Sequence, residues 1–194
     1  MSLLTYSFSA GAVLVFLEEK FLKKYLSYLY EQSEKLNSIP RGYGLVIAIN
    51  VVVGGFTIMS LGFRVAKARS VFIEKAKATG DKDAEERFSY PKLYAEGFSE
   101  EAKQFNCIQR SHQHALETFP HFMAMSMLGG LRHPILVASS GILMIASRLS
   151  FSDGYSTGEP KKRYQAWYSS GIWVSLLIPA VASLSTASAL LLSL

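Results

Sequence analysis

The sequence predicts an all-α integral membrane protein: a four-transmembrane-helix bundle preceded by an amphipathic helical extension. Charge is concentrated in three regions, residues 18–41, 64–110 and 148–163, although the mean hydropathy of the whole chain is only +0.20. The stretches between these regions are long, and residues 44–63 carry no charge at all. Because an α-helix needs about 20 apolar residues to cross the hydrocarbon core of a bilayer, this pattern favours several membrane spans.

Four stretches that are apolar over most of their length are expected to span the bilayer: residues 44–63, 115–131, 134–147 and 166–194. The second stretch is interrupted by Glu117 and His121. The third is short unless it includes Leu149 and Phe151. The fourth is uncharged and begins near Trp167, where the aromatic belt of a membrane helix places such a residue.

The first forty residues are expected to form an extension, and residues 41–194 the four-helix membrane domain. Residues 1–17 are uncharged but lack the basic start and the small-residue cleavage site of a signal peptide. On a helix, residues 18–36 place several leucines and Tyr25 on one side and most of their charges elsewhere. An amphipathic helix of this kind is suited to lie on a bilayer or on a partner protein.

Basic residues predict the orientation of the chain in the membrane. The loop expected after the first span and the loop before the fourth lie on the same side and hold many basic residues: Arg64, Lys67, Arg69, Lys75, Lys77, Lys82, Arg87, Lys92, Lys103, Arg148, Lys161, Lys162 and Arg163. The positive-inside rule places both loops on the cytosolic or equivalent face. The net charge of +5 therefore indicates sidedness and not nucleic-acid binding, because no basic patch is interleaved with aromatic residues in a soluble module.

The most informative stretch is residues 105–120, where polar residues run along an otherwise apolar helix. The polar residues recur at spacings of three or four, which puts them on one stripe: Asn106, Arg110, Gln113, Glu117 and His121. Charges at membrane depth generally face the interior of a bundle. There the stripe either binds a ligand, or its charges pair with one another or with a neighbouring helix.

No disulfide or metal site is expected. Cys107 is the only cysteine, so it has no intramolecular partner. His114 and His121 share a helix face, but no carboxylate or thiolate stands at a matching spacing. Ordinary polar packing is the expected role of the histidines.

Three separated segments carry a family resemblance: residues 105–120, Gly129-Gly130 followed by His133-Pro134, and residues 154–163. Together they resemble the membrane-associated proteins in eicosanoid and glutathione metabolism (MAPEG), most closely the type-three microsomal glutathione S-transferases. The resemblance covers residues 43–194. It implies a four-helix bundle that forms a homotrimer in the endoplasmic reticulum or mitochondrial membrane and binds glutathione, as co-substrate, between neighbouring subunits.

The resemblance also implies a set of site residues. Glutathione presents two carboxylates, one ammonium and a thiol, so its site needs cations for the carboxylates and an anion for the ammonium. The expected glutathione-binding residues are Arg69, Arg110, Gln113, His114 and Glu117, and the expected catalytic residues are Tyr155 with Lys162 or Arg163. A cation from the Lys162–Arg163 pair would stabilise the thiolate, which is the reactive form.

Two functions from different classes fit these expectations. The first is a membrane-bound glutathione transferase or glutathione-dependent peroxidase, whose lipophilic electrophile or lipid hydroperoxide arrives from the bilayer. The second is a catalytically silent subunit of a larger membrane complex, such as a mitochondrial respiratory assembly. His114 and Phe151 favour the second, because the family has asparagine and tyrosine there, whereas the retained charges favour the first.

Overall fold

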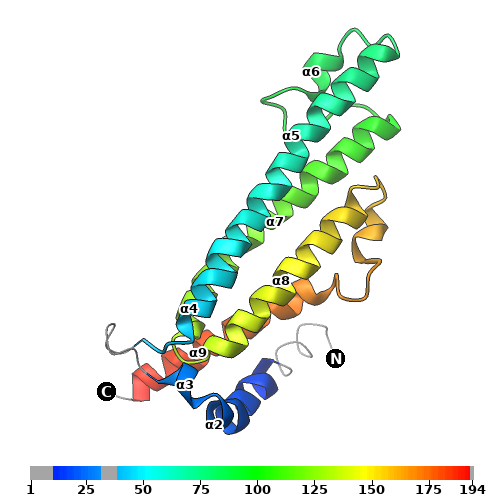
Figure 1. The fold of residues 1–194 in the computed structure, drawn as a ribbon. Coiled ribbons are helices and arrows are strands. Elements are labelled where there is room, and N and C mark those ends of the chain that lie inside the picture. Colours follow the sequence, from blue (N-terminus) through cyan, green and yellow to red (C-terminus); the bar gives the residue numbers. More distant parts are fainter. Residues whose placement is uncertain (1–10, 32–38, 193–194) are drawn as a thin grey trace. The chain divides into compact units, whose positions relative to one another are not determined.

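The computed structural model describes residues 11–31 and 39–192 and is built of helices (Figure 1). Residues 11–17 are helical and lead into the first named element. The elements are η1 (Glu18–Leu22), α2 (Lys23–Tyr25), α3 (Ser27–Tyr30), α4 (Tyr43–Val46), η2 (Ile47–Val53), α5 (Gly54–Ala78), α6 (Ala84–Phe88), α7 (Glu100–Gly130), α8 (Pro134–Tyr155), η3 (Pro160–Tyr164) and α9 (Gly171–Leu192). Of the η elements, the first two are π-helical and the third is a 3-10 helix.

Within the described residues, three helical stretches are long and apolar enough to cross a membrane: Tyr43–Ala78, Pro134–Tyr155 and Gly171–Leu192. They contain the expected first and third spans and most of the fourth. The remaining expected span, residues 115–131, falls almost entirely in α7, whose polar stripe keeps it out of this group. The observed fold is therefore all-helical, with three long apolar helices and further, more polar ones.

The predicted ends of the apolar helices need correction. α5 continues to Ala78, so the basic residues from Arg64 to Lys77 lie on a helix and not in a loop. α8 continues to Tyr155 and encloses Arg148, whose side chain is buried. Hydropathy shows where a chain leaves the hydrocarbon core, but not where its helix ends. Alanine, lysine, glutamate and arginine favour helix in water as well, so both helices continue beyond their apolar stretches.

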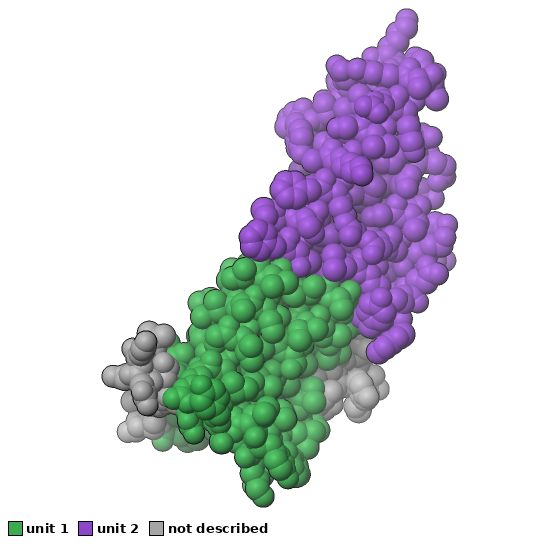
Figure 2. All heavy atoms as spheres, viewed as in Figure 1, with its two compact units in different colours: residues 1–55, 118–147, 170–194 green, residues 56–117, 148–169 purple. Residues whose placement is uncertain are grey.

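The chain divides into two compact units (Figure 2). Among the described residues, unit 1 comprises 11–31, 39–55, 118–147 and 170–192, and unit 2 comprises 56–117 and 148–169. Unit 1 holds α9 and the larger part of α8, and unit 2 holds nearly all of α5 together with α6 and η3.

A buried amide holds helices of unit 1 together. Asn50 is fully buried, and its Nδ2 donates to Ser126 Oγ at 3.0 Å and to the Val137 carbonyl at 2.9 Å. Gly129 allows α7 to approach α9, since a Cβ there would lie 2.7 Å from the Ala182 Cβ. Close approach at small residues is typical of helix packing in membranes.

A substitution at Gly141 tests the packing around Asn50. A Cβ on Gly141 would overlap Asn50 Oδ1 and lie 2.6 Å from its Cγ. Gly141→Ala should therefore displace the amide from its two partners and lower the free energy of unfolding by about 1–3 kcal/mol, measured by denaturation in detergent. Gly55→Ala is the control, because no atom lies within 4 Å of its Cβ position. Equal stability of the two variants would contradict this packing.

Three phenylalanines from three different helices form the core of unit 2. The ring centroids of Phe72 and Phe88 lie 5.7 Å apart, and those of Phe88 and Phe105 lie 5.6 Å apart. Phe88 and Phe105 are almost completely buried. The cluster fixes the short helix α6 against α5 and α7, so the segment between the two long helices is part of a packed core.

The helix predicted over residues 18–36 is not continuous in its described part. The helix is interrupted at Leu26, where φ is −115° and ψ is 34°. Leu22, Tyr25 and Leu26 of its predicted apolar side are exposed, whereas Glu18 is fully buried. Residues 32–38, which include the end of the predicted helix, and residues 1–10 of the apolar stretch lie outside the described residues.

Candidate functional site

A pocket of about 210 Å³ in unit 2 brings together four of the residues predicted for the site. Its lining comes in pairs from α7, α8 and η3: Arg110, His114, Phe151, Tyr155, Arg163 and Tyr164. A second hollow of about 440 Å³ also has Arg110 and Tyr155 in its wall and extends to Phe98 and Cys107. Because the two hollows share these side chains, they adjoin each other.

Helical spacing and one close contact assemble the pocket. Arg110 and His114 are four residues apart on α7, and Phe151 and Tyr155 are four apart on α8, so each pair lies on one helix face. Gly154 lets η3 approach α8, since a Cβ there would overlap the carbonyl oxygen of Lys162. η3 is thereby held where its side chains reach the pocket.

Arg110 and Glu117 form a bidentate ion pair. Nη1 of Arg110 lies 2.6 Å from Glu117 Oε1, and Nη2 lies 3.2 Å from Oε2. The two side chains are 47% and 55% exposed. Exposed ion pairs typically contribute about 0–1 kcal/mol, so a ligand that offers both charges can replace the pair at little cost. Of the two alternatives left open for the polar stripe, the structure contains the mutual pairing of its charges.

A buried arginine fixes the tautomer of His114. Nη1 of Arg148 lies 2.7 Å from Nδ1 of His114, and the Arg148 side chain is almost completely buried. Arginine can only donate, so Nδ1 accepts and the proton of the neutral imidazole lies on Nε2. The ring also stacks on Phe151, with centroids 5.1 Å apart. The neutral ring of His114 therefore carries its N–H on Nε2.

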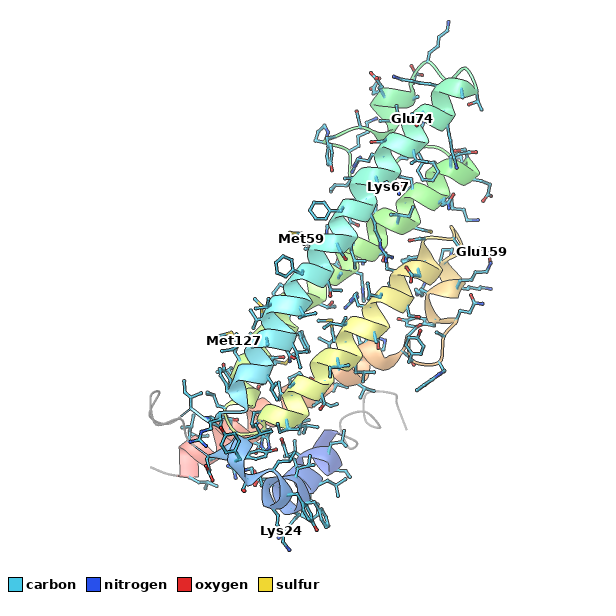
Figure 3. The ribbon with its side chains drawn as sticks, viewed as in Figure 1. Lys24, Met59, Lys67, Glu74, Met127 and Glu159 are labelled. Carbon is cyan, nitrogen blue, oxygen red and sulfur yellow. The ribbon has the colours of Figure 1, made fainter. Side chains whose placement is uncertain are left out.

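The two candidate cations of η3 have different surroundings. Lys162 donates to Glu159 at 2.8 Å, and this hydrogen bond lowers the pKa of Glu159, which lies on the turn before η3 (Figure 3). Arg163 donates to the Pro160 carbonyl at 2.9 Å, and its guanidinium lies 5.6 Å from the ring centroid of Tyr155. Of the two, Arg163 is the one in the pocket wall.

Four of the predicted residues are in the wall of neither hollow: Glu117 and Lys162, whose ion pairs are described above, and Arg69 and Gln113. Arg69 is buried and donates to the carbonyl oxygens of Phe88 at 2.8 Å and Lys92 at 2.7 Å, and its guanidinium lies 4.3 Å from the Tyr90 ring. It fastens residues 88–92 to α5. Gln113 is half-buried on α7.

The prediction did not include Arg148 or Tyr164 among the site residues. Arg148 carried a usable signal, because a charge inside a mostly apolar helix usually marks a functional or paired position. Tyr164 carried none. Its place in the wall depends on how η3 folds back after Gly158, which has a positive φ of 85°.

The family of the chain follows from its sequence over most of its length. The sequence profile of the MAPEG family matches residues 47–184. The chain belongs to the MAPEG family. Members of this family include membrane-bound glutathione transferases and peroxidases, and the matched range contains all the residues that line the pocket. Family membership and the three long apolar helices identify an integral membrane protein.

Proposed function

We propose that this MAPEG protein is a glutathione transferase with glutathione-dependent peroxidase activity, of the type-three microsomal class. Its substrates are lipophilic electrophiles or lipid hydroperoxides in an endoplasmic reticulum or mitochondrial membrane. The observation that supports this proposal is that Arg110, His114, Tyr155 and Arg163 line the same pocket. These residues combine two permanent cations with an imidazole and a phenol, a set suited to an anionic thiol peptide.

Glutathione is expected to enter by exchanging partners with the ion pair. Its γ-glutamyl end carries a carboxylate and an ammonium on the same carbon, which are the complements of Arg110 and Glu117. The pair opens, Arg110 takes the carboxylate and Glu117 takes the ammonium, so that no charge is left unpaired. Because breaking the exposed Arg110–Glu117 pair costs little free energy, most of the free energy of the new contacts with glutathione contributes to its binding.

The other side of the pocket is suited to hold the sulfur. The guanidinium of Arg163 favours the thiolate over the thiol, and Nε2–H of His114 and the phenol of Tyr155 can donate to it. The thiol releases its proton to water, and the thiolate then forms a C–S bond with an electrophilic carbon. Either a leaving group departs with the electron pair of its bond to that carbon, or the π bond of an activated alkene breaks and its other carbon takes a proton. With a hydroperoxide, the thiolate takes the terminal oxygen and an alcohol leaves, and a second glutathione completes the reaction as disulfide and water.

The homotrimer of the family remains part of the proposal. In such an assembly Gln113 and further contacts would come from the neighbouring subunit, and the lipophilic substrate would arrive from the bilayer. For Arg69 we favour the structural role, because its guanidinium is already hydrogen-bonded to the carbonyls of Phe88 and Lys92.

One observation favours the second candidate, a silent subunit of a larger complex. Arg110 and Glu117 satisfy each other, and an ion pair of this kind needs no ligand. The two functions predict different migration in native gels and different turnover of glutathione. A small oligomer that conjugates or oxidises glutathione supports the enzyme, whereas migration within a large complex without turnover supports the subunit.

Glutathione affinity tests the role of Arg110. Arg110→Gln should weaken binding about 10- to 100-fold in calorimetry, because it removes a charge-assisted contact worth roughly 1.5–3 kcal/mol. Arg87→Gln is the matched control, since it breaks an Arg–Asp pair of 3.1 Å, with Asp81, away from this pocket. Equal affinity of wild type and Arg110→Gln would exclude the proposed contact.

A further inference from the structure

The arm, defined as residues 11–30, buries a carboxylate and exposes large apolar side chains. Glu18 is fully buried, whereas Val13, Phe16 and Phe21 are 55%, 58% and 56% exposed. A helix in water turns such apolar side chains inward and its carboxylates outward. The exposed apolar side chains are suited to apolar surroundings outside the molecule.

The buried carboxylate is fully accommodated by unit 1 itself. Glu18 accepts from the backbone N–H of Leu136 at 3.0 Å and from the Tyr30 hydroxyl at 2.5 Å, and its Oε2 lies 2.8 Å from His133 Nδ1. Leu136 is in the first turn of α8, where the unpaired N–H groups and the helix dipole favour an anion. His133 in turn contacts Ser185 of α9 at 2.8 Å. These contacts fasten the arm to α8 and α9.

The arm lies beside a helix that is itself long and apolar enough to span a membrane. Gly11 packs on Val181, because a Cβ at Gly11 would lie 3.2 Å from Val181 Cγ2. Val181 is in the middle of α9 (Gly171–Leu192). Ser185, which His133 connects to Glu18, is one turn further along the same helix. The first two turns of the arm therefore lie beside the central part of α9.

Lysines and tyrosines follow the apolar turns of the arm, as they do at the end of a membrane helix. The basic residues are Lys20, Lys23 and Lys24, and Lys24 points away from the rest of unit 1 (Figure 3). Tyr25 and Tyr28 are 75% and 63% exposed. Aromatic side chains with polar tips and long basic side chains concentrate where the hydrocarbon meets the headgroups.

We propose that the first part of the arm, residues 11–17, is embedded in the bilayer beside α9 as a membrane segment additional to the MAPEG bundle. Its occupant is lipid: acyl chains cover Val13 and Phe16, and headgroups surround the lysines and Tyr25. Continuity with α9 favours lipid over a protein partner, because the exposed side chains of the arm continue the surface of a membrane span. This inference does not depend on glutathione binding.

Cysteine labelling in vesicles of pure phosphatidylcholine tests the proposal. Purified full-length protein carrying Val13→Cys, Phe16→Cys or Lys24→Cys is reconstituted and treated with a membrane-impermeant maleimide on both sides. The wild type reports the background from Cys107. Val13→Cys and Phe16→Cys should be labelled roughly tenfold or more slowly than Lys24→Cys, and all three should be labelled rapidly after denaturation in detergent.

Two results would overturn the proposal. If Phe16→Cys is labelled as fast as Lys24→Cys in pure lipid, the arm is exposed to water. If Val13→Cys and Phe16→Cys are protected in native membranes but not in pure lipid, a protein covers the arm. Quenching of a fluorophore attached at residue 16 by acyl-chain spin labels gives an independent readout, and strong quenching is expected.

Discussion

Arg69→Met should lower the free energy of unfolding by about 3–5 kcal/mol, measured by denaturation in detergent. The guanidinium is buried and donates to the carbonyls of Phe88, Ser89 and Lys92. Its removal leaves these oxygens without their donor and releases the segment that packs on α5. Arg69→Lys should recover only part of the loss, because an ammonium cannot reproduce the planar fork.

Lys67→Met provides the control for this prediction. Lys67 is on the same helix and its loss removes the same charge, but its side chain is exposed (Figure 3). Its effect should stay within about 0.5 kcal/mol. If Arg69→Met were as stable as Lys67→Met, the assignment of Arg69 to the structure of unit 2 would be wrong.

Arg163→Ala should raise the apparent pKa of the bound glutathione thiol by roughly one to two units, measured from the ultraviolet absorbance of the thiolate against pH. The thiolate forms as pH rises through the pKa of the thiol, so the titration should move to higher pH. At a pH below both pKa values the thiolate fraction, and with it the rate of conjugation, should then fall about 10- to 100-fold.

Lys162→Ala removes an equal charge one residue earlier and should leave the titration unchanged, because Lys162 pairs with Glu159 outside the pocket wall. A higher thiol pKa in the Lys162→Ala variant alone would show that Lys162, and not Arg163, stabilises the thiolate. Unchanged titrations in both single variants and in the double variant would show that neither cation of η3 stabilises the thiolate.

The long helices were predictable from the sequence, but their ends were not. Uncharged stretches locate α8 and α9, since length and hydropathy suffice for a membrane span. The turns from Arg64 to Lys77 are charged and still helical, which hydropathy does not detect. The burial of Glu18 was not predictable, because its partners Tyr30, His133 and Leu136 come together only when the arm packs on α8. Against α9, the carboxylate is inside and the phenylalanines are outside.

The candidate site was predictable to the extent that it depends on helix periodicity and family resemblance. Arg110 and His114, and likewise Tyr155, were expected in the site, and they line one pocket. The choice between Lys162 and Arg163 depends on how closely η3 approaches Gly154, which no periodicity encodes. Arg69 donates to backbone carbonyls of a segment about twenty residues away. Because every residue has a backbone carbonyl, no residue type in the sequence indicates these acceptors.

Binding of glutathione and of N-acetylglutathione, compared by calorimetry in wild type and Glu117→Gln, tests the central claim most directly. Acetylation removes the ammonium that Glu117 is proposed to bind. The wild type should bind glutathione about tenfold or more tightly than the acetylated peptide, and Glu117→Gln should lose most of that difference. A wild-type protein that binds neither peptide, or binds both equally, would contradict the proposed site.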